Sequence, residues 1–309
     1  MNKDKIENKK AIAYAILAAA LYALSSPISK LLLHYIPPTT LAALMYLGAG
    51  LGLMLNELIH RAMGMMSKEQ PLACRDLPYV AGMVVLDIAA PIFLMSGLTM
   101  TTAANAALLN NFEIVATSVI ALFLFGEKIS LRLWFAIALV TLSSITLSLD
   151  GEGCFSFSRG SIFILLACLC WGLENNCTRI LSGKNPRHIV IIKGFFSGTG
   201  VLAISLVIGE RIAYGVYIPV AMALGFVTYG LSIMFYIYAQ RKLGAAKTST
   251  YYAVSPFIGV GLSLLIFHEM PSLTFICALV IMVAGTYFAM TVRKPKCVPG
   301  AEKSTYMPY

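Results

Sequence analysis

The chain alternates long apolar runs with short polar connections, and the runs are as long as membrane-spanning helices. Crossing a hydrocarbon core of ~30 Å takes about 20 apolar residues in a helix. Ten such runs occur, at residues 11–33, 38–60, 78–98, 101–124, 131–149, 160–181, 189–209, 215–240, 244–267 and 272–292. The pattern therefore predicts ten transmembrane helices with no soluble domain between them.

The composition agrees with hydrocarbon as the main solvent. Of the 309 residues, 59% are hydrophobic and 12% are charged, whereas a soluble domain carries about 25% charged residues. A chain this poor in charge lacks the polar side chains to cover a water-exposed surface. The polar start at residues 1–10 leads into a run long enough to span, so we expect a retained first helix and no cleaved signal peptide.

Lysine and arginine gather in alternate connections. With the ten helices numbered in order, 19 of the 23 Lys and Arg residues lie on the side of both termini, three lie on the other side, and Lys193 lies within a span. Because cytoplasmic connections are enriched in these residues, we expect cytoplasmic termini and a multi-pass protein of a bacterial or archaeal plasma membrane. The net charge of +9 forms no basic stripe, so nucleic acid is not an expected partner.

The two halves of the chain resemble each other. An offset of 149 residues aligns Tyr22–Lys30 with Trp171–Arg179 and Pro37 with Pro186. Each half has five predicted helices, an odd number, so the second half must cross the membrane in the opposite sense. The predicted fold is all-α, with ten transmembrane helices as two inverted five-helix repeats. Its parts are a cytoplasmic segment at 1–10, a first repeat at 11–149, an outer linker at 150–159, a second repeat at 160–292 and a cytoplasmic tail at 293–309.

Inverted repeats indicate a function. They are a common plan of secondary transporters, whose halves give alternating access to a site near the bilayer midplane. The sequence has no Walker motif, which disfavours direct coupling to ATP. We therefore expect a secondary transporter of small metabolites, whose transport would be coupled to protons, run as exchange or be facilitated diffusion. A non-transporting scaffold and an intramembrane enzyme stay open as alternatives; the enzyme is disfavoured because all four histidines lie at segment ends, and no catalytic residue, metal or cofactor is expected.

Several motifs resemble a known family. The run Ala103–Leu109, followed by Phe112-Glu113-Ile114-Val115 and Leu124-Phe125-Gly126-Glu127, resembles the fourth helix of EamA-type proteins of the drug/metabolite transporter superfamily. Gly244-Ala245-Ala246 through Ser255-Pro256 to Phe267-His268-Glu269 resembles their ninth helix, and Trp171-Gly172 fits their sixth. The resemblance covers residues 11–292 and implies a ten-helix fold with a central cavity and the function of an exporter or exchanger of metabolites. Ile114 stands where the family pattern has proline, which leaves open whether the fourth helix kinks.

Ionisable side chains inside the predicted spans are the first candidates for a site. Each costs roughly 2.5–3.5 kcal/mol on insertion scales and usually faces a cavity or a partner. Glu113 shares a helix face with Asn110 and Thr117, and we expect it to bind a cationic group or a proton. The alternative is a buried acid hydrogen-bonded to Asn110 or to a neighbouring helix. Asp87 precedes Pro91 by one turn and is expected either to line the site or to cap or pair locally.

Glu174 and Lys193 are the other two charged candidates. Glu174 shares a face with Trp171 and Thr178, and an aromatic wall beside a carboxylate suits an amine or a planar cation. The alternative is packing, with Glu174 bridging to its neighbours Asn175, Asn176 or Arg179. Lys193 is expected either to snorkel towards the headgroups or to anchor a substrate carboxylate.

Polar and aromatic positions complete the predicted site. The eighth helix carries Tyr229, Ser232, Tyr236 and Gln240 on one stripe, and core or membrane-interface tyrosines are the alternative. Pro27, Pro91 and Pro256 are expected to interrupt the first, third and ninth helices, and Gly48 and Gly52 to mark close helix packing. The predicted substrate-binding residues are Glu113, Glu174, Asp87, Asn110, Trp171, Tyr22, Ser25, Tyr229, Tyr236, Tyr252, Ser255 and Lys193.

Three acids against one deep lysine suit small zwitterionic or cationic metabolites, such as amino acids or amines. The expected partners are that small-molecule substrate, protons as a coupling ion, and the lipid bilayer. A homodimer is left open.

Overall fold

The computed structural model describes residues 2–64, 70, 72–125, 130–148, 158–181, 184–211, 215–243, 251–268 and 270–290. Within these ranges the chain is all-helical and has no strand. The first half contains α1 Asn2–Ala23, α2 Ser25–Leu32, α3 Pro38–Ala62, a 3-10 turn at Cys74–Asp76, α4 Leu77–Met100, α5 Ala103–Leu109, α6 Phe112–Phe125 and α7 Leu131–Ser148.

The second half contains α8 Arg159–Leu181, α9 Pro186–Ile192, α10 Gly198–Val207, α11 Tyr217–Gly225, α12 Ser232–Leu243, α14 Ser255–Phe267 and α15 Leu273–Met290. Two π-helical stretches join consecutive helices: η2 (Lys193–Ser197) links α9 to α10, and η3 (Phe226–Leu231) links α11 to α12. A π-helical turn inserts an extra residue into a helix and is frequent at functional sites.

Eight helical segments of the described chain are long and apolar enough to cross a membrane. They run Glu7–Leu32, Pro38–Ala62, Cys74–Met100, Ala103–Leu124, Leu131–Ser148, Arg159–Thr178, Pro186–Val207 and Tyr217–Ala239. These match the first eight predicted segments. The last two predicted segments contain the shorter apolar helices Ser255–Phe267 and Leu273–Ala289, and residues 244–250 and 291–309 beside them lie outside the described ranges.

Two of the membrane helices are interrupted within their length, and a turn also directly precedes α14. Turns occur at Leu24 between α1 and α2, at Asn110–Asn111 between α5 and α6, and at Ala253–Val254 before α14. Pro27 and Pro256 lie in the first turn after two of these breaks, where the missing backbone donor costs little. The break in the fourth helix needs no proline. Tight i→i+3 hydrogen bonds, such as Glu113 N to Asn110 O at 3.2 Å, close it instead.

Pro91 does not interrupt its helix, so that prediction was wrong. It lies inside α4, which continues from Leu77 to Met100. Proline in a helix interior removes one backbone hydrogen bond. The helix persists because α4 packs along α8 over much of its length and Pro91 itself is buried.

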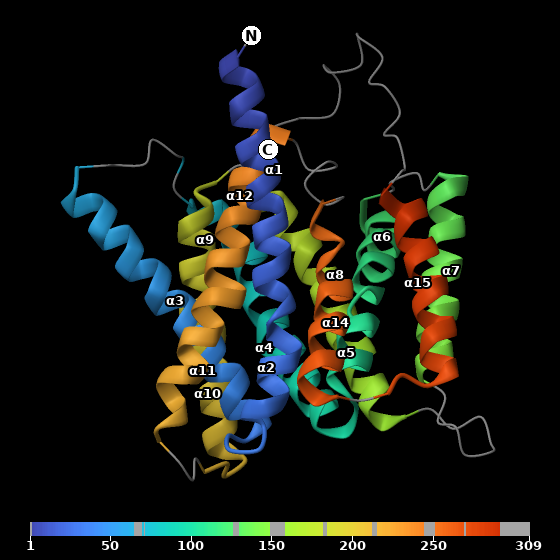
Figure 1. Cartoon of the computed structure of the whole chain (residues 1–309). Helices are drawn as coiled ribbons and strands as arrows, with labels where there is room; N and C mark the ends of the chain where they lie inside the picture. Colours follow the sequence, from blue (N-terminus) through green and yellow to red (C-terminus); the bar gives the residue numbers. More distant parts are fainter. Residues whose placement is uncertain are drawn as a thin grey trace.

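The two halves of the chain interlock. Helix α4 packs on α8, α12 on α1, α15 on α7, and α14 on both α5 and α1. Figure 1 shows α7 and α15 side by side, and shows α1 beginning and α15 ending at the same end of the bundle. At the centre, α3 meets the second half without room for side chains: a Cβ on Gly48 would lie 2.0 Å from the Met222 carbonyl oxygen. The predicted close packing at Gly48 and Gly52 is confirmed.

Candidate functional site

Three charged side chains from different helices meet in the interior. The ammonium of Lys193 lies 3.1 Å from an Asp87 carboxylate oxygen and 2.9 Å from a Glu174 carboxylate oxygen. Asp87 is fully buried, Glu174 is 3% exposed, and the Lys193 side chain is 12% exposed. We call these residues the central triad. Buried charges are stable only when they are paired and hydrogen-bonded, and each acid here has the same lysine as its ionic partner.

The fold explains why the triad forms. Asp87 lies midway along α4 and Glu174 in α8, and these two helices pack against each other. Lys193 is the first residue of η2, where the wider π-helical turn changes the direction of side chains relative to a regular helix. Two expectations are therefore corrected. Lys193 does not snorkel to the headgroups, because two carboxylates bind it, and Asp87 pairs across helices rather than within its own.

Neutral hydroxyl groups donate further hydrogen bonds to the two acids of the triad, at the second oxygen of Asp87 and at the Glu174 oxygen that also binds Lys193. The Tyr46 hydroxyl donates to Asp87 across 3.1 Å, and the Thr178 hydroxyl donates to Glu174. Thr178 was expected on this face, whereas the sequence analysis missed Tyr46, which lies in an otherwise apolar stretch of α3. The alternative bridge from Glu174 to Asn175 or Asn176 is absent among the described contacts, and the side chain of Arg179 lies outside the described ones.

Glu113 has a different environment. The Asn175 amide donates to its carboxylate across 2.6 Å, and no basic group lies within ion-pair distance of Glu113 in the described part of the chain. Asn175 also approaches the Thr117 hydroxyl at 3.4 Å. This is the neighbouring-helix alternative of the sequence analysis, with α8 supplying the amide. Glu113 nevertheless lies within electrostatic range of Glu174 and Lys193, so it belongs to the same polar interior as the triad.

Tyrosine rings connect Glu113 to the triad. The Tyr22 ring lies 6.3 Å from that of Tyr229 and 5.9 Å from that of Tyr252, and Tyr236 meets Tyr252 edge-on at 5.0 Å. Tyr229 meets Tyr46 at 5.2 Å, which leads to Asp87. Tyr22 and Tyr252 are both within electrostatic range of Glu113. The predicted tyrosines thus form one cluster, together with the buried Ser232, whose hydroxyl donates to the Ala18 carbonyl across 2.9 Å.

The remaining predicted residues lie beside the helix breaks. Asn110 and Asn111 form the break of the fourth helix, and Ser255 begins α14 directly after the break of the ninth. The Asn110 side-chain oxygen, the Asn111 side-chain nitrogen and the Ser255 hydroxyl are buried and have no hydrogen-bond partner among the described residues. Ser25 begins α2 and adjoins Tyr229, and Trp171 is buried in the core.

The three breaks come together in space. A Cβ placed on Gly259 would lie 3.2 Å from the Ala107 Cβ and 3.3 Å from the Ala23 carbonyl oxygen. Gly259 is one turn beyond Ser255, Ala107 is one turn before Asn110, and Ala23 directly precedes the break at Leu24. Polar backbone and side-chain groups beside these three turns are therefore concentrated next to the tyrosine cluster.

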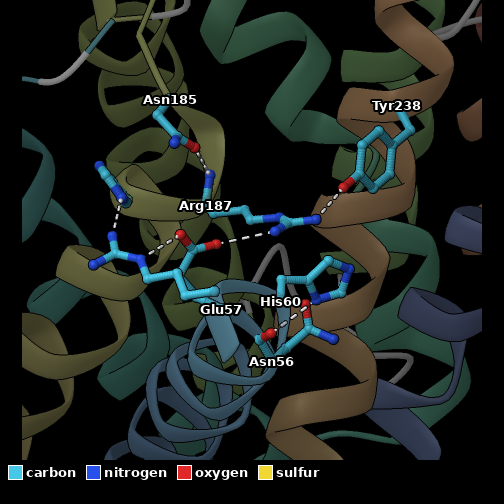
Figure 2. Close-up of polar contacts among 8 residues, drawn as sticks. Asn56, Glu57, His60, Asn185, Arg187 and Tyr238 are labelled. Atoms are coloured by element: carbon cyan, nitrogen blue, oxygen red, sulfur yellow. Dashed lines mark hydrogen bonds and ion pairs between the residues drawn. The ribbon is translucent and has the colours of Figure 1, made fainter. Parts of the chain in front are cut away.

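A second polar network lies at one end of the bundle (Figure 2). Glu57 of α3 pairs with Arg187 of α9 at 2.9 Å and with Arg61 at 3.0 Å. Arg187 also donates to the Tyr238 hydroxyl of α12 across 2.7 Å. The sequence analysis missed this network, although Glu57 is an acid inside the predicted segment 38–60 and the cost of such a group was a usable signal.

A third network lies at the opposite end of the same helices. The carboxylate of Glu210, just after α10, accepts hydrogen bonds from the backbone N–H groups of Thr39 and Thr40, at 3.2 and 2.7 Å. The hydroxyl groups of Thr40 and Ser205 also donate to it, at 2.8 and 3.2 Å. An acid at a helix N-terminus accepts hydrogen bonds from backbone N–H groups that have no partner within the helix. Its negative charge also interacts favourably with the helix dipole. Glu210 therefore joins the end of α10 to the start of α3.

Comparison with known proteins decides the family. The EamA-like transporter family matches residues 9–149 and again residues 158–291. The chain belongs to the EamA-like transporter family. An "Uncharacterized transporter" of Methanothermobacter thermautotrophicus (strain ATCC 29096 / DSM 1053 / JCM 10044 / NBRC 100330 / Delta H) is 24% identical over 288 residues, which cover 88% of this chain and 83% of that protein. The resemblance stated from the sequence motifs is confirmed.

A solved crystal structure shares the fold of this EamA-family chain. It superposes with a TM-score of 0.65 at 17% identity, over 90% of this chain and 95% of its own. Family membership and the apolar helices together make the protein a multi-pass membrane transporter with a small-molecule substrate.

Proposed function

We propose that this EamA-family transporter is a secondary carrier of small cationic or zwitterionic metabolites, such as amino acids or amines, and that it works as an exporter or exchanger by alternating access. One observation carries the proposal. Glu113 is an acid in the interior of the bundle whose described partner is an amide and not a cation. An intramembrane acid of this kind is favoured when it can meet a cationic ligand or a proton.

The charges of the interior support the proposed substrate class. Asp87, Glu174 and Glu113 offer three carboxylates, and Lys193 supplies one ammonium that lies between the first two. Negative charge in excess of positive charge is costly at this depth. A cationic group of the substrate, or protons taken up in its absence, would balance it. The tyrosine cluster next to Glu113 offers ring faces, which attract cations.

The helix breaks support the proposal that the substrate is zwitterionic, because they offer groups that can bind a carboxylate. Interrupted helices near the bilayer midplane present their N-termini to anionic groups of a substrate in other carriers. Here the N-termini of α2 and α14 lie at the meeting point of the breaks, and the buried Ser255 hydroxyl has no partner among the described residues. A substrate with an ammonium at Glu113 and a carboxylate at these N-termini would satisfy both groups.

The helix contacts support two inverted five-helix repeats with ten crossings. In the predicted repeat, the third helix corresponds to the eighth, and the sixth corresponds to the first. The third and sixth predicted helices pack closely as α4 on α8. The eighth and first predicted helices pack closely in the same way, as α12 on α1. The predicted fourth and ninth helices, which also correspond, both contain a turn in their described parts, at Asn110–Asn111 and at Ala253–Val254. The Lys and Arg distribution further favours cytoplasmic termini in a plasma membrane.

Counterflow in proteoliposomes tests the proposal. We would measure uptake of radiolabelled lysine, serine, putrescine and glucose 6-phosphate into vesicles preloaded with each unlabelled compound. The expected result is counterflow of an amino acid or the amine that is lost in Glu113→Gln. Asp76→Asn, at an acid outside the interior, should keep wild-type rates. Preference for the sugar phosphate, or full activity of Glu113→Gln, would overturn the proposal, and no counterflow with any compound would favour a scaffold.

A further inference from the structure

The two end networks are reciprocal. Each consists of an acid near the end of one helix and the first turn of its repeat partner. Glu57 near the end of α3 binds Arg187 in the first turn of α9, and Glu210 after the end of α10 binds Thr39 and Thr40 in the first turn of α3. We call them the Glu57 latch and the Glu210 latch.

The repeat relates the helices that the latches join. The offset of 149 residues that aligns Pro37 with Pro186 places the start of α3 on the start of α9. The segment from α9 through η2 to α10 is therefore the second-half counterpart of α3. The two run antiparallel, because the start of each one meets the end of the other. One pair of corresponding helices is thus fastened at both ends of the bundle.

The same helix pair has a close backbone contact between the latches. A Cβ on Gly194 would lie 2.4 Å from the backbone nitrogen and Cα of Gly50, and one on Gly198 would lie 2.8 Å from the backbone of Leu47. Backbones this close cannot approach further, but they can tilt about the contact. Gly194 directly follows Lys193, so the pivot adjoins the central triad.

We propose that the Glu57 latch and the Glu210 latch are the two gates of the transporter, and that they open in alternation as α3 and the α9–α10 segment tilt about the Gly50–Gly194 contact. Tilting that separates one pair of ends brings the other pair together. The inference rests on the proposed alternating access. In this structure both latches are closed.

The two latches differ in chemistry, and the difference predicts separate responses. The Glu57 latch joins opposite charges: the Arg187 guanidinium lies between Glu57 and Tyr238, with side chains of Glu57 and Arg187 only 10% and 17% exposed. The Glu210 latch has one charge and four neutral donors. Neutralising either acid weakens only its own end, since hydrogen bonds to a carboxylate are stronger than those to a neutral amide.

A reporter cysteine near the site tests the gates without knowledge of the substrate. Ser25→Cys places a thiol at a position that is 3% exposed, close to the tyrosine cluster. We would label it with a membrane-impermeant maleimide in right-side-out and inside-out vesicles. Mass spectrometry of the peptide that spans the substituted position would quantify the reaction, so that native cysteines do not interfere.

The expected result is opposite sidedness. Glu57→Gln should raise labelling about tenfold from the face that carries the termini, the response to a change of about 1.4 kcal/mol in the balance of states. Glu210→Gln should do so from the other face. The matched control is Asp76→Asn, which removes a 3.2 Å ion pair to Lys184 that belongs to neither latch, and it should leave labelling unchanged.

Two outcomes would overturn the proposal: unchanged labelling in both latch variants, or labelling from the same face in both. If Glu57→Gln does not fold, Tyr238→Phe weakens the same latch, and Thr40→Val weakens the other. Failure of counterflow alone would leave this readout intact, so the gates and the proposed substrate are tested separately.

Discussion

The acids of the interior fall into two kinds of environment. Asp87 and Glu174 share Lys193, with Tyr46 and Thr178 as further donors. Glu113, within electrostatic range of Glu174 and Lys193, has the Asn175 amide. Residue type alone does not distinguish the three, because all are intramembrane acids, although Glu113 is half-buried whereas Asp87 and Glu174 are buried. The hydrogen-bond or ionic partner determines the role of each acid. An acid paired with a cation of the protein stabilises the fold, whereas an acid that binds only an amide can accept a cation from a ligand.

The comparison assigns different work to the two environments. The central triad is expected to hold α4, α8 and η2 in register, and so to contribute mostly to stability. Glu113 is expected to contribute mostly to transport. Substitutions that affect stability and transport in different proportions test this assignment.

Removal of the shared cation should have the largest effect. Lys193→Met leaves Asp87 and Glu174 buried without a counter-ion, and breaking a buried pair in this way costs about 3–5 kcal/mol. We expect a large fall in the thermal unfolding midpoint of the purified protein in detergent. The triple variant Asp87→Asn, Glu174→Gln, Lys193→Met removes all three charges and should recover most of the loss. A Lys193→Met protein as stable as the wild type would contradict the triad's role.

Neutralisation of Glu113 should affect transport and spare stability. Glu113→Gln keeps the shape of the side chain and removes a charge that no described basic group balances. We expect counterflow to fall more than about tenfold, equivalent to about 1.4 kcal/mol, with an unfolding midpoint equal to or above that of the wild type. A lower midpoint together with normal transport would reverse the assignments of the two environments.

The amide partner of Glu113 should have an intermediate effect. Asn175→Ala removes a hydrogen bond to Glu113, and such a bond contributes about 1.5–3 kcal/mol when the carboxylate is charged, as it would be with a cationic substrate bound. The expected result is a weaker apparent substrate affinity with a smaller change in maximal rate, measured as the concentration dependence of counterflow. Asn105→Ala, at an amide near the start of α5 and distant in sequence from Asn175, serves as the control. Equal kinetics in the two variants would separate Asn175 from the site.

The hydroxyl of Tyr46 should have the smallest effect. Tyr46→Phe removes its hydrogen bond to Asp87 and keeps the ring contact with Tyr229. The ion pair with Lys193 remains, so we expect a loss of about 0.5–1.5 kcal/mol in unfolding free energy. Tyr79→Phe, at an exposed ring, should be neutral. A loss as large as that of Lys193→Met would mean that Tyr46, rather than the lysine, holds Asp87.

Much of the fold could be predicted from the lengths of the apolar runs and from the distribution of Lys and Arg. The thickness of the bilayer determines the first, and the orientation of the chain in the membrane determines the second. The first eight spans and the family follow from those signals and from the motifs. The break at Asn110–Asn111 could not be predicted, because a missing proline at Ile114 leaves several conformations open and packing selects one. The prediction at Pro91 was wrong for the opposite reason. A proline favours a break in a helix, but the packing of α4 on α8 keeps this helix continuous.

The sequence was sufficient to predict which charged residues form the site, but only partly sufficient to predict which of them pair with one another. The free-energy cost of placing an ionisable group in a membrane span identified Asp87, Glu113, Glu174 and Lys193. Such a group is retained only where it has a partner or a function. Which acid meets the lysine depends on contacts between α4, α8 and η2, and on a π-helical turn that carries no sequence signal we could read. Glu57 had a usable signal, whereas the neutral donors around Glu210 had none.

Carbodiimide labelling tests the central claim that Glu113 is the acid available to the substrate. A hydrophobic carbodiimide reacts with carboxyl groups that are protonated in an apolar setting, and not with those held as ion pairs. Peptide mass spectrometry would quantify the reaction at each acid, with and without the compound that shows counterflow. We predict labelling at Glu113, protection by that compound, and no labelling at Asp87 or Glu174. Labelling of Asp87 or Glu174 in preference to Glu113, or labelling of Glu113 that the transported compound leaves unchanged, would contradict the account.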